Sequence, residues 1–417
     1  MPDDGPFDTN GSNVGPGRME KLTIKDIDLK GKRFLMRVDF NIPLDENQNI
    51  TDDKRIRASL PTIRYAVEQG AKVILMSHLG RPKGQVIQEM SLRPVAVRLG
   101  ELLGKKVGFA PDCIGPDVES LVQDLDDGDV LLLENVRFHK EETANDPEFS
   151  KQMARLGDVY GNDAFGSAHR AHGSTVGVTQ YFETRVSGFL MEKELEYLGA
   201  TVANPERPFI TILGGAKIGD KIPVIENLLN KVDILLIGGG MMFTFLKAQA
   251  KEIGKSLLDG ESLDFVERLV NDFSDKIVLP IDCVVSEIFD FKARRIGETA
   301  VVSVDDIPEN CLGLDIGPRT IELFTEACKD AKTVVWNGPM GVFEIEATAA
   351  GTFAIANFLA ELTDKGATTI IGGGDSASAV KKAGLAGKMT HVSTGGGASL
   401  EFLQGKALPG VVALTDA

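Results

Sequence analysis

Apolar runs of strand length alternate with amphipathic stretches along most of the chain. The apolar runs, which are rich in Val, Ile and Leu, lie at residues 34–40, 73–77, 130–134, 209–213, 234–237, 277–280, 333–336 and 368–371. The stretches with a helical pattern include residues 58–68, 146–156, 222–229, 262–273 and 319–331. Near-continuous apolar runs are typical of parallel strands that are covered on both faces. The alternation therefore predicts an α/β fold built from doubly wound, Rossmann-like parallel sheets.

Two domains are expected, because 417 residues exceed what one ordinary hydrophobic core accommodates. Residues 190–203 have a helical pattern, and Pro205 and Pro208 end it because proline cannot donate to a helix ladder. We expect a first domain at residues 21–188, a connecting helix at 189–207, a second domain at 208–403 and a tail at 404–417. A connecting helix of this kind favours hinge closure of the two lobes.

Residues 1–20 differ in composition from the rest of the chain. They are rich in Gly, Pro, Asp and Asn and contain no apolar run. The segment therefore lacks the apolar core of a signal peptide or of a membrane anchor. We interpret it as a disordered N-terminal extension.

The predicted strands of the first half end in polar and basic residues. In open α/β sheets, ligands bind beyond the carboxyl ends of the strands. The basic residues there are Arg37, Arg55, His78, Arg81, Arg137, His139, His169, Arg170 and His172. Arginine binds phosphate oxygens through two parallel hydrogen bonds, and histidine donates to them as well. Each residue alone could cap a strand beside a neighbouring carboxylate, but the whole set on one half favours an anion site.

The predicted strands of the second half end in glycines instead. Glycine clusters lie within residues 214–219, 238–240, 372–374 and 395–397. Glycines let backbone N–H groups approach phosphates, and the N-terminus of a following helix adds partial positive charge. A single cluster is equally typical of a tight strand–helix turn, but four clusters in one half favour a nucleotide site. Neither the Walker motif GxxxxGK followed by Ser or Thr nor a GxGxxG fingerprint is present in them.

Three charged residues accompany these glycines. Lys217 and Lys221 are four residues apart where a turn enters a helix, and such a pair is unfavourable unless an anion lies between the two ammonium groups. The alternative is that both are solvated surface lysines. Asp375 follows three glycines, where a carboxylate can hold Mg²⁺ against phosphate oxygens. Its alternative role is the N-cap of the following helix.

Composition narrows the possible function classes. The formal net charge is −16, a bias opposite to that of a general nucleic-acid binder. No apolar stretch reaches the roughly 20 residues that a membrane helix needs. The four cysteines are scattered without paired spacing, which is typical of free thiols in a reducing compartment. We therefore expect a cytoplasmic protein that binds neither nucleic acid nor membranes.

Two other functions fit parts of the pattern. A metal-dependent hydrolase would use His78, His169 and His172, because a His-x-x-His turn can ligate zinc. Arg170 between the last two histidines would repel a dication, and the HExxH motif is absent. A non-catalytic nucleotide-binding protein would not need the charged residues that are present in both halves.

Eight segments together resemble the phosphoglycerate kinase family, and they follow one another in the family order. They are RVDFN at 37–41, SHLGRP at 77–82, LENVRFH at 133–139, DAFGSAHRAH at 163–172, LGGAK at 213–217, VWNGPMGVFE at 335–344, GGGD at 372–375 and VSTGGG at 392–397. The resemblance extends from about Lys21 to the C-terminus, and residues 1–20 lie outside it. One motif arises easily by chance, whereas eight in order are specific.

The resemblance implies a hinge-bending kinase that interconverts 1,3-bisphosphoglycerate plus Mg-ADP and 3-phosphoglycerate plus Mg-ATP, a step of glycolysis. It implies that the N-terminal domain binds the glycerate and the C-terminal domain binds the nucleotide. It also implies a monomer, and a C-terminal tail that returns to the N-terminal domain. The expected partners are the small-molecule substrates alone, with Mg²⁺ as the cofactor.

The family's functional residues can be carried over to matching positions. The resemblance implies that the substrate is bound by Asp39, Phe40, Asn41, Arg55, His78, Leu79, Gly80, Arg81, Arg137 and Arg170. It implies that the nucleotide is bound by Gly214, Lys217, Lys221, Gly238, Gly313, Asn337, Glu344, Gly373, Gly374, Asp375 and Ser376, with Asp375 linked to the metal. Among these residues we expect Arg55, Lys217 and Lys221 to supply the catalytic charge, with Asp39 orienting Arg55.

Overall fold

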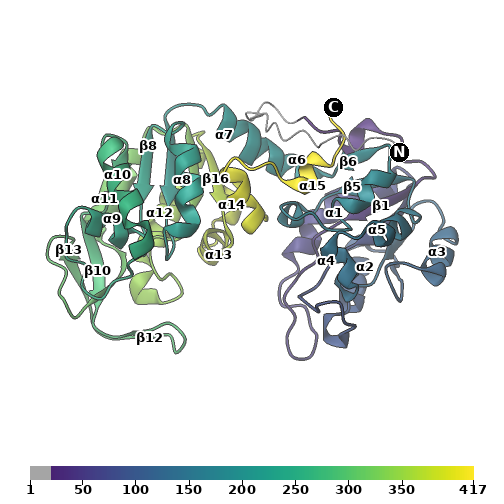
Figure 1. The fold of residues 1–417 in the computed structure, drawn as a ribbon, viewed down its shortest axis with the longest axis horizontal. Coiled ribbons are helices and arrows are strands. Elements are labelled where there is room, and N and C mark those ends of the chain that lie inside the picture. Colours follow the sequence, from purple (N-terminus) through teal and green to yellow (C-terminus); the bar gives the residue numbers. More distant parts are fainter. Residues whose placement is uncertain (1–19) are drawn as a thin grey trace, which may run out of the picture.

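The computed structural model describes residues 20–417, which form two α/β lobes joined by a helix (Figure 1). Of the extension expected at residues 1–20, all but the last residue lies outside this described part. Glu20 lies inside it, and its carbonyl accepts a hydrogen bond of 2.9 Å from the backbone N–H of Ala417. No helix within the described range is both long and apolar enough to cross a bilayer.

The N-terminal lobe is built around a parallel sheet with the strand order β3-β4-β2-β1-β5-β6. These strands are β1 Arg33–Arg37, β2 Lys72–Met76, β3 Gly108–Phe109, β4 Val130–Leu132, β5 Val159–Asn162 and β6 Arg185–Ser187. Successive side chains of a strand point to opposite faces. Accordingly Phe34 and Met36 of β1 pack into one apolar cluster, and Leu35 packs into the other. Both faces of the sheet are therefore buried, as the continuous apolar runs predict.

Helices cover both faces of this sheet. They are α1 Lys54–Glu68, α2 Arg93–Leu103, α3 Pro116–Gln123, α4 Lys140–Ala144 and α5 Pro147–Ala154. Local sequence signals set several of their ends. The side chain of Asp146 accepts a hydrogen bond from the backbone N–H of Phe149 and caps α5. Gly104 ends α2 in the left-handed conformation, with φ of 70°.

The C-terminal lobe has a second parallel sheet, with the order β17-β16-β15-β7-β8-β9. Its strands are β7 Phe209–Leu213, β8 Ile234–Ile237, β9 Ile277–Val278, β15 Thr333–Asn337, β16 Thr368–Gly372 and β17 His391–Val392. The helices of this lobe are α8 Ile222–Leu229, α9 Met242–Ala248, α10 Leu263–Asp272, α11 Pro318–Cys328, α12 Ala350–Asp364, α13 Gly374–Lys382 and α14 Gly397–Leu403. The two doubly wound lobes confirm the predicted fold class.

The C-terminal lobe also contains antiparallel strands that the sequence pattern did not predict. They are β10 Asp282–Ser286, β13 Thr299–Ser303 and β14 Leu312–Ile316, with the hairpin β11 Phe289–Asp290 and β12 Arg295–Ile296 beside them. These strands are short, and β13 is largely exposed. No helix separates these strands along the chain, so they lie outside the strand–helix alternation that identified the parallel strands.

Some predicted strands are too long at their carboxyl ends. The run at 34–40 ends as a strand at Arg37, and the run at 130–134 ends at Leu132. Val38 and Phe40 are fully buried although they lie beyond the β1 ladder. The apolar pattern therefore marks burial, which continues past the last strand pairing and into the loops that line the site.

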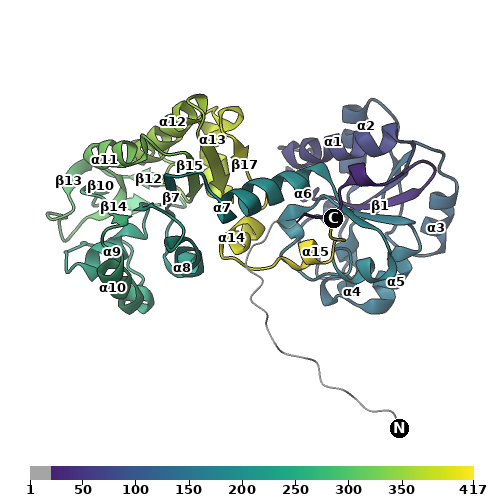
Figure 2. The ribbon, with the colours of Figure 1, turned by 90° about the horizontal axis from the view of Figure 1, so that it is seen from above.

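One helical segment joins the lobes, as Figures 1 and 2 show. It comprises α6 Phe189–Glu194, a π-helical section at Leu195–Ala200 and α7 Thr201–Ala203. The Asp163 carboxylate in the N-terminal lobe accepts hydrogen bonds from the backbone N–H groups of Leu190 and Met191. At the other end of α6, the Glu194 carboxylate accepts bonds of 2.8 and 3.0 Å from Thr394 in the C-terminal lobe. Carboxylates thus bind this helical segment to both lobes.

The chain after α14 runs back to the N-terminal lobe (Figure 2). It forms α15 Pro409–Val412, where the backbone N–H of Gly410 donates to the carbonyl of Ala168 at 2.8 Å. Further on, the carbonyl of Thr415 accepts a bond of 2.9 Å from the backbone N–H of Leu22. The two lobes are therefore connected by the helical segment and by this returning tail.

Candidate active site

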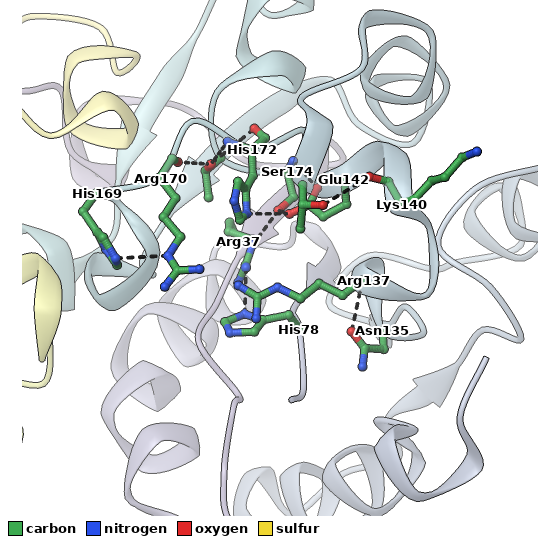
Figure 3. Close-up of polar contacts among 12 residues, drawn as sticks. Arg37, His78, Asn135, Arg137, Lys140, Glu142, His169, Arg170, His172 and Ser174 are labelled. Atoms are coloured by element: carbon green, nitrogen blue, oxygen red, sulfur yellow. Dashed lines mark hydrogen bonds and ion pairs between the residues drawn. The ribbon is translucent and has the colours of Figure 1, made fainter. Parts of the chain in front are cut away.

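The loops after β1, β2, β4 and β5 bring basic side chains together at one edge of the N-terminal sheet. In parallel sheets these carboxyl ends lie on the same side, which is where open α/β folds bind ligands. Figure 3 shows the group around Arg37 and His78. We call the following residues the cationic cluster: Arg37, Arg55, His78, Arg137, His169, Arg170 and His172.

Arg37 and His78 form the buried base of the cationic cluster. Arg37 is the last residue of β1 and is fully buried, and His78 is 5% exposed. One terminal nitrogen of the Arg37 guanidinium, Nη2, lies 3.0 Å from His78 Nδ1. Burial, and then the charge of Arg37, hold the pKa of His78 well below its ordinary value. This imidazole is therefore neutral at physiological pH.

Arg137 is held in a 3-10 turn at Val136–Phe138, which the side chain of Asn135 caps. Its Nη1 donates to the carbonyl of Gly80 at 2.9 Å, whereas its Nε is enclosed and has no partner. Burial, followed by the charge of Arg37, lowers the pKa of Arg137 to about 10. A buried donor without a partner is costly. The guanidinium is therefore well suited to an anion.

The histidines beside Arg170 are also disfavoured as cations. Arg170 Nε donates to His169 Nε2 at 3.1 Å. Burial, and then the charge of Arg137, lower the pKa of His172 to about 4. Burial also lowers the pKa of His169, with Arg170 as the next cause. Positive charge is thus concentrated here to the point where the imidazoles stay neutral, and a bound anion would relieve the repulsion.

Arg55 enters the cationic cluster from α1. Its Nη1 donates to Asp39 Oδ1 at 3.1 Å and to the carbonyl of Asn41 at 2.9 Å. The expected pairing of Asp39 with Arg55 is therefore present. The side chain of Asn41 accepts a bond of 2.8 Å from the backbone N–H of Gly80, which links the loops after β1 and β2. These loops hold one another in place.

Three of the residues expected at the substrate site lie apart from these contacts. Phe40 and Leu79 are buried in the apolar core of the lobe. They place the neighbouring loops, and their side chains do not extend into the cationic cluster. Arg81 is exposed, and among the described residues no hydrogen bond joins it to the cluster. Its role as a substrate ligand stays a prediction.

The C-terminal lobe offers an open helix end at α13. Gly373 precedes the helix with φ of 84°, a left-handed conformation that favours glycine. No side chain caps this end, so its first backbone N–H groups are free for an anion. Asp375 lies exposed in the first turn of α13 and is not its N-cap, so the capping alternative is wrong. Ser376 is buried, and its hydroxyl accepts a bond of 2.6 Å from the Gly338 N–H.

The two lysines lie in different environments. Lys217 is exposed, in the turn after β7. Lys221 is partly buried at the start of α8, and its ammonium group contacts Asn337 Oδ1. Burial lowers the pKa of Lys221 to about 8. The Nδ2 atom of Asn337 is enclosed without a partner, which makes this pair a second candidate for anion binding.

Other glycines of this lobe serve close packing. A Cβ atom at Gly214 would lie 2.2 Å from the carbonyl oxygen of Pro339, and one at Gly238 would lie 2.5 Å from Met340 Sδ. A Cβ at Gly313 would lie only 1.9 Å from the ring of Phe243. These glycines are needed for the fold whether or not they meet a ligand. Their contact with the nucleotide stays a prediction, as does that of the partly buried Glu344 in the loop after β15.

The lobes approach one another next to Arg55. A small cavity of about 10 Å³ is lined by Asp39, Arg55 and Phe165 of the N-terminal lobe and by Thr394 of the C-terminal lobe. Asp52 lies three residues before Arg55, and its carboxylate accepts a hydrogen bond of 2.7 Å from Lys381 of α13 across the gap between the lobes. The start of α1 and helix α13 therefore face the same inter-lobe space.

Within residues 20–417, His78, His169 and His172 do not come together as a group of potential metal ligands. Between residues 20 and 417, the single group of potential ligand atoms close enough to share an ion is Asp112, Cys113 and His139. His139 Nε2 already contacts Asp112 Oδ1 at 2.7 Å. His169 and His172, which the hydrolase alternative requires, are not part of that group. The structure therefore gives this alternative no support.

Sequence reasoning missed two residues beneath the cationic cluster. Glu142 in α4 is fully buried and accepts hydrogen bonds from the backbone N–H and the hydroxyl of Ser174. Glu142 lies in a charged run, KEE at 140–142, that is typical of a solvated helix face. Only the tertiary structure turns this carboxylate inward, so the sequence carried no signal for it.

Comparisons with known proteins agree with this arrangement. The sequence model of the phosphoglycerate kinase family matches residues 24–406. A cytosolic phosphoglycerate kinase of Triticum aestivum is 59% identical over 398 residues, which cover 95% of this chain and 98% of that protein. A phosphoglycerate kinase of Chlorobium chlorochromatii (strain CaD3) is 57% identical over 401 residues, covering 95% and 100% of the two chains.

Solved structures give the same result. The phosphoglycerate kinase of Coxiella burnetii superimposes with a TM-score of 0.85 at 40% identity, covering 94% of this chain and 98% of that one. The phosphoglycerate kinase of Pyrococcus horikoshii OT3 superimposes with a TM-score of 0.81 at 34% identity and the same coverage. The similarity thus extends over both lobes and the helical segment between them.

In the ligand-free protein, the pKa values of two histidines should be shifted in opposite directions from the ordinary value. We expect His172 to titrate near pH 4 and His139 above the ordinary 6.5, because burial and Arg137 disfavour charged His172 whereas the Asp112 hydrogen bond favours charged His139. Unfolded His172 binds a proton near pH 6.5 and folded His172 only near pH 4. Protonation of His172 in the unfolded chain therefore lowers the stability of the folded state as the pH falls from about 6.5 to about 4. NMR titration of the imidazole protons measures both, and a higher midpoint for His172 than for His139 would contradict the interpretation.

Proposed function

Because the chain belongs to the phosphoglycerate kinase family, we propose that its cationic cluster binds the phosphoglycerate and that the glycine-rich edge of its C-terminal lobe binds the nucleotide. The family reaction moves a phosphoryl group between the carboxyl group of 3-phosphoglycerate and ADP or ATP, as a step of glycolysis. The observation that carries the proposal is the enclosed, unpartnered Nε of Arg137 amid neutral imidazoles. Positive charge concentrated in this way favours a bound anion.

The N-terminal lobe would bind the substrate through donors alone. Arg137 and Arg170 offer guanidinium groups to a phosphate, and His78 in its neutral form offers one N–H. Arg55 lies beside them, but Asp39 and the carbonyl of Asn41 hold one of its nitrogens. The remaining nitrogens of Arg55 are then available for the transferring phosphoryl group on the side toward the other lobe.

The C-terminal lobe would bind the nucleotide phosphates at the start of α13. The uncapped N–H groups of this helix provide partial positive charge, and the ammonium groups of Lys217 and Lys221 lie on the turn after β7. Lys221 has a pKa of about 8 in the ligand-free protein. A nearby phosphate would raise this value by favouring the charged form. The two lysines and the helix end thus form an anion site opposite the cationic cluster.

Magnesium fits the residues of this site. Asp375 is an exposed carboxylate in the first turn of α13, beside the helix end proposed to hold phosphates. Mg²⁺ commonly takes one or two protein carboxylates and completes its coordination with phosphate oxygens and water. When bound there, the ion would neutralise charge on the nucleotide phosphates. Asp375 would hold it on the nucleotide side of the gap between the lobes.

Catalysis then requires alignment and charge stabilisation. Phosphoryl transfer passes through a loose transition state whose charge is spread over three equatorial oxygens, so no protein nucleophile is needed. We assign the charge stabilisation to Arg55 from one lobe and to Lys217 and Lys221 from the other. The substrates react once the lobes approach one another. Closure also excludes water, which would otherwise hydrolyse the acyl phosphate.

We further propose that the enzyme acts as a monomer in the cytoplasm. All four cysteines are buried free thiols, as suits a reducing compartment. The net charge of −16 disfavours self-association. Light scattering after gel filtration should give the mass of one chain, and the mass of a dimer would contradict the first part of the proposal.

The direct test of the function is a coupled assay for ATP made from 1,3-bisphosphoglycerate and ADP by the purified chain. Turnover that depends on both substrates supports the proposal. Nucleotide binding without turnover would favour the non-catalytic alternative. Hydrolysis of the bisphosphoglycerate without ADP would show that the two lobes do not act together.

Lys217→Met should lower kcat by roughly 10²–10³-fold, the scale seen when one group that stabilises transition-state charge is removed. The KM values should change less than kcat, because the charge of this side chain is needed more in the transition state than in the bound ground state. Lys388→Met, which removes another exposed lysine of the same lobe, is the control and should keep wild-type turnover. Near-normal turnover of Lys217→Met would remove this residue from the mechanism.

Arg170→Ala should raise the KM for 3-phosphoglycerate by about tenfold or more, the weight of one hydrogen bond to a charged group. The KM for ATP should change little, because Arg170 belongs to the N-terminal lobe. Arg57→Ala removes an exposed arginine of α1 that pairs with Asp53, and it should leave both constants unchanged. A larger effect of Arg170→Ala on ATP than on phosphoglycerate would overturn the assignment of substrates to lobes.

Asp375→Asn should raise the Mg²⁺ concentration needed for half-maximal activity, because the amide has no charge to hold the ion. Activity measured over a magnesium series at saturating substrates gives this value. Asp330→Asn, at an exposed site of the same lobe, is the matched control. An unchanged magnesium dependence in Asp375→Asn would exclude this carboxylate as the metal ligand.

A further inference from the structure

A fully buried carboxylate lies beneath the cationic cluster. Glu142 in α4 has no exposed surface. Its Oε2 accepts from the backbone N–H of Ser174 at 2.7 Å, and its Oε1 accepts from the Ser174 hydroxyl at 2.7 Å. Figure 3 shows this pair next to Arg37 and His172. Burying an ionised carboxylate is costly unless it is paired and hydrogen-bonded, so this position demands an explanation.

In the hydrogen bonds between Glu142, Ser174 and Arg37, the donor and the acceptor of each bond are fixed. An ionised carboxylate accepts and cannot donate, so the single hydrogen of the Ser174 hydroxyl is committed to Glu142. The Ser174 oxygen must then accept its other bond, which comes from Arg37 Nε at 2.8 Å. This contact and the bond of Arg37 Nη1 to the carbonyl of Val38 fix the plane of the guanidinium.

The same logic extends to His78. A guanidinium only donates, so His78 Nδ1, at 3.0 Å from Arg37 Nη2, must be the unprotonated acceptor. The proton of the neutral ring is therefore on Nε2. In the described part of the chain this atom has no hydrogen-bond partner, and it is not one of the enclosed polar atoms. It is thus a donor that reaches solvent.

We propose that Glu142 and Ser174 are positioning residues, which act through Arg37 to hold His78 in the tautomer that donates from Nε2 to the substrate phosphate. The inference rests on the proposed function, because it takes the cationic cluster as the site of the phosphoglycerate. It adds that the His78 tautomer is already set by these contacts before the substrate binds. A neutral histidine has two tautomers, and only the one with a proton on Nε2 offers a donor on the open side of the ring. The other tautomer would present a lone pair to an anion and repel it.

The contacts between Glu142, Ser174 and Arg37 lie in the interior, where water does not reach them. Ser174 and Arg37 are both fully buried, so water cannot replace the serine hydroxyl as the partner of Arg37 Nε. His172 Nδ1 also lies near Glu142, at 3.8 Å from its Oε1, which is too long for a hydrogen bond. The hydrogen-bond link from the Glu142 side chain to Arg37 thus runs through Ser174, whereas the charge of Glu142 also acts on Arg137.

The first experiment measures the tautomer of His78 in the wild-type protein. The chemical shifts of the two ring nitrogens in ¹⁵N-labelled protein, without substrate at pH 7, distinguish a protonated from an unprotonated atom. His78→Gln, which removes the signals, assigns them. We expect one tautomer, with the proton on Nε2. A proton on Nδ1, or a mixture of both forms, would overturn the proposal without any variant having to fold.

The second experiment breaks the chain at its middle. Ser174→Ala removes the hydroxyl but keeps Glu142, Arg37 and His78. We expect the KM for 3-phosphoglycerate to rise by about tenfold, the scale of one neutral hydrogen bond, with an unchanged KM for ATP. The His78 nitrogens should then show both tautomers. An unchanged KM for phosphoglycerate, or an unchanged tautomer, would count against a positioning role.

A matched control separates positioning from packing. Ser150 in α5 is also fully buried, and its hydroxyl donates to a backbone carbonyl, that of Asp146, at 2.8 Å. Ser150→Ala should cost similar stability but leave the His78 tautomer and both KM values unchanged. If it raised the KM for phosphoglycerate as much as Ser174→Ala, the effect would be structural and the proposal would fail.

Kinetics of a His78 variant distinguish failure of this inference from failure of the proposed function. If His78→Ala raises the KM for phosphoglycerate and Ser174→Ala does not, the site stands and the positioning role is refuted. If His78→Ala leaves that KM unchanged, His78 does not bind the substrate, and the proposed site itself is wrong at this residue. Only an increase in both variants supports the full proposal.

Discussion

The structure depends on one electrostatic constraint, the concentration of positive charge at the carboxyl ends of the N-terminal strands. Arg37 is fully buried, and Arg137 nearly so. Their charges and the surrounding protein keep the neighbouring imidazoles neutral, with a pKa of about 4 at His172. Such crowding is unfavourable in the folded protein unless carboxylates or a ligand offset it. Glu142 and Asp39 offset part of it, and the remainder supports the proposal that an anionic substrate binds there.

A second constraint is that the two proposed anion sites lie on different lobes. Each parallel sheet is covered on both faces, so the site residues of each lobe stand on a tightly packed core. Asp163 holds the start of the connecting helix, and Glu194 holds it to the C-terminal lobe. The returning tail adds a further link through Leu22 and Thr415. The Lys381–Asp52 ion pair and the packing of Phe165 on Phe402 join the two lobes as well.

Sequence patterns predicted the fold class and much of the candidate site. The apolar runs identified the parallel strands, and the polar residues after them identified Arg55, His78 and Arg170 as neighbours. The pairing of Asp39 with Arg55 followed from the order of the motifs. The same reasoning missed the antiparallel strands β10, β13 and β14, because no helix separates them and they fall outside the strand–helix alternation on which it relied. It also gave Asp375 a possible capping role, which the position of Gly373 excludes.

The sequence by itself determined which residue types follow each strand, because strand and helix periodicity and the motif order are local properties. Only the tertiary structure decided how those residues meet. Glu142 appears as part of a charged helix face in the sequence, yet the packing of α4 buries it against Ser174. Gly214 and Gly238 appear as phosphate-loop residues and Gly313 as a nucleotide contact, yet their missing Cβ atoms leave room for other parts of the protein. Burial, tautomer and pKa are set by neighbours that are distant in sequence, and a local pattern cannot encode them.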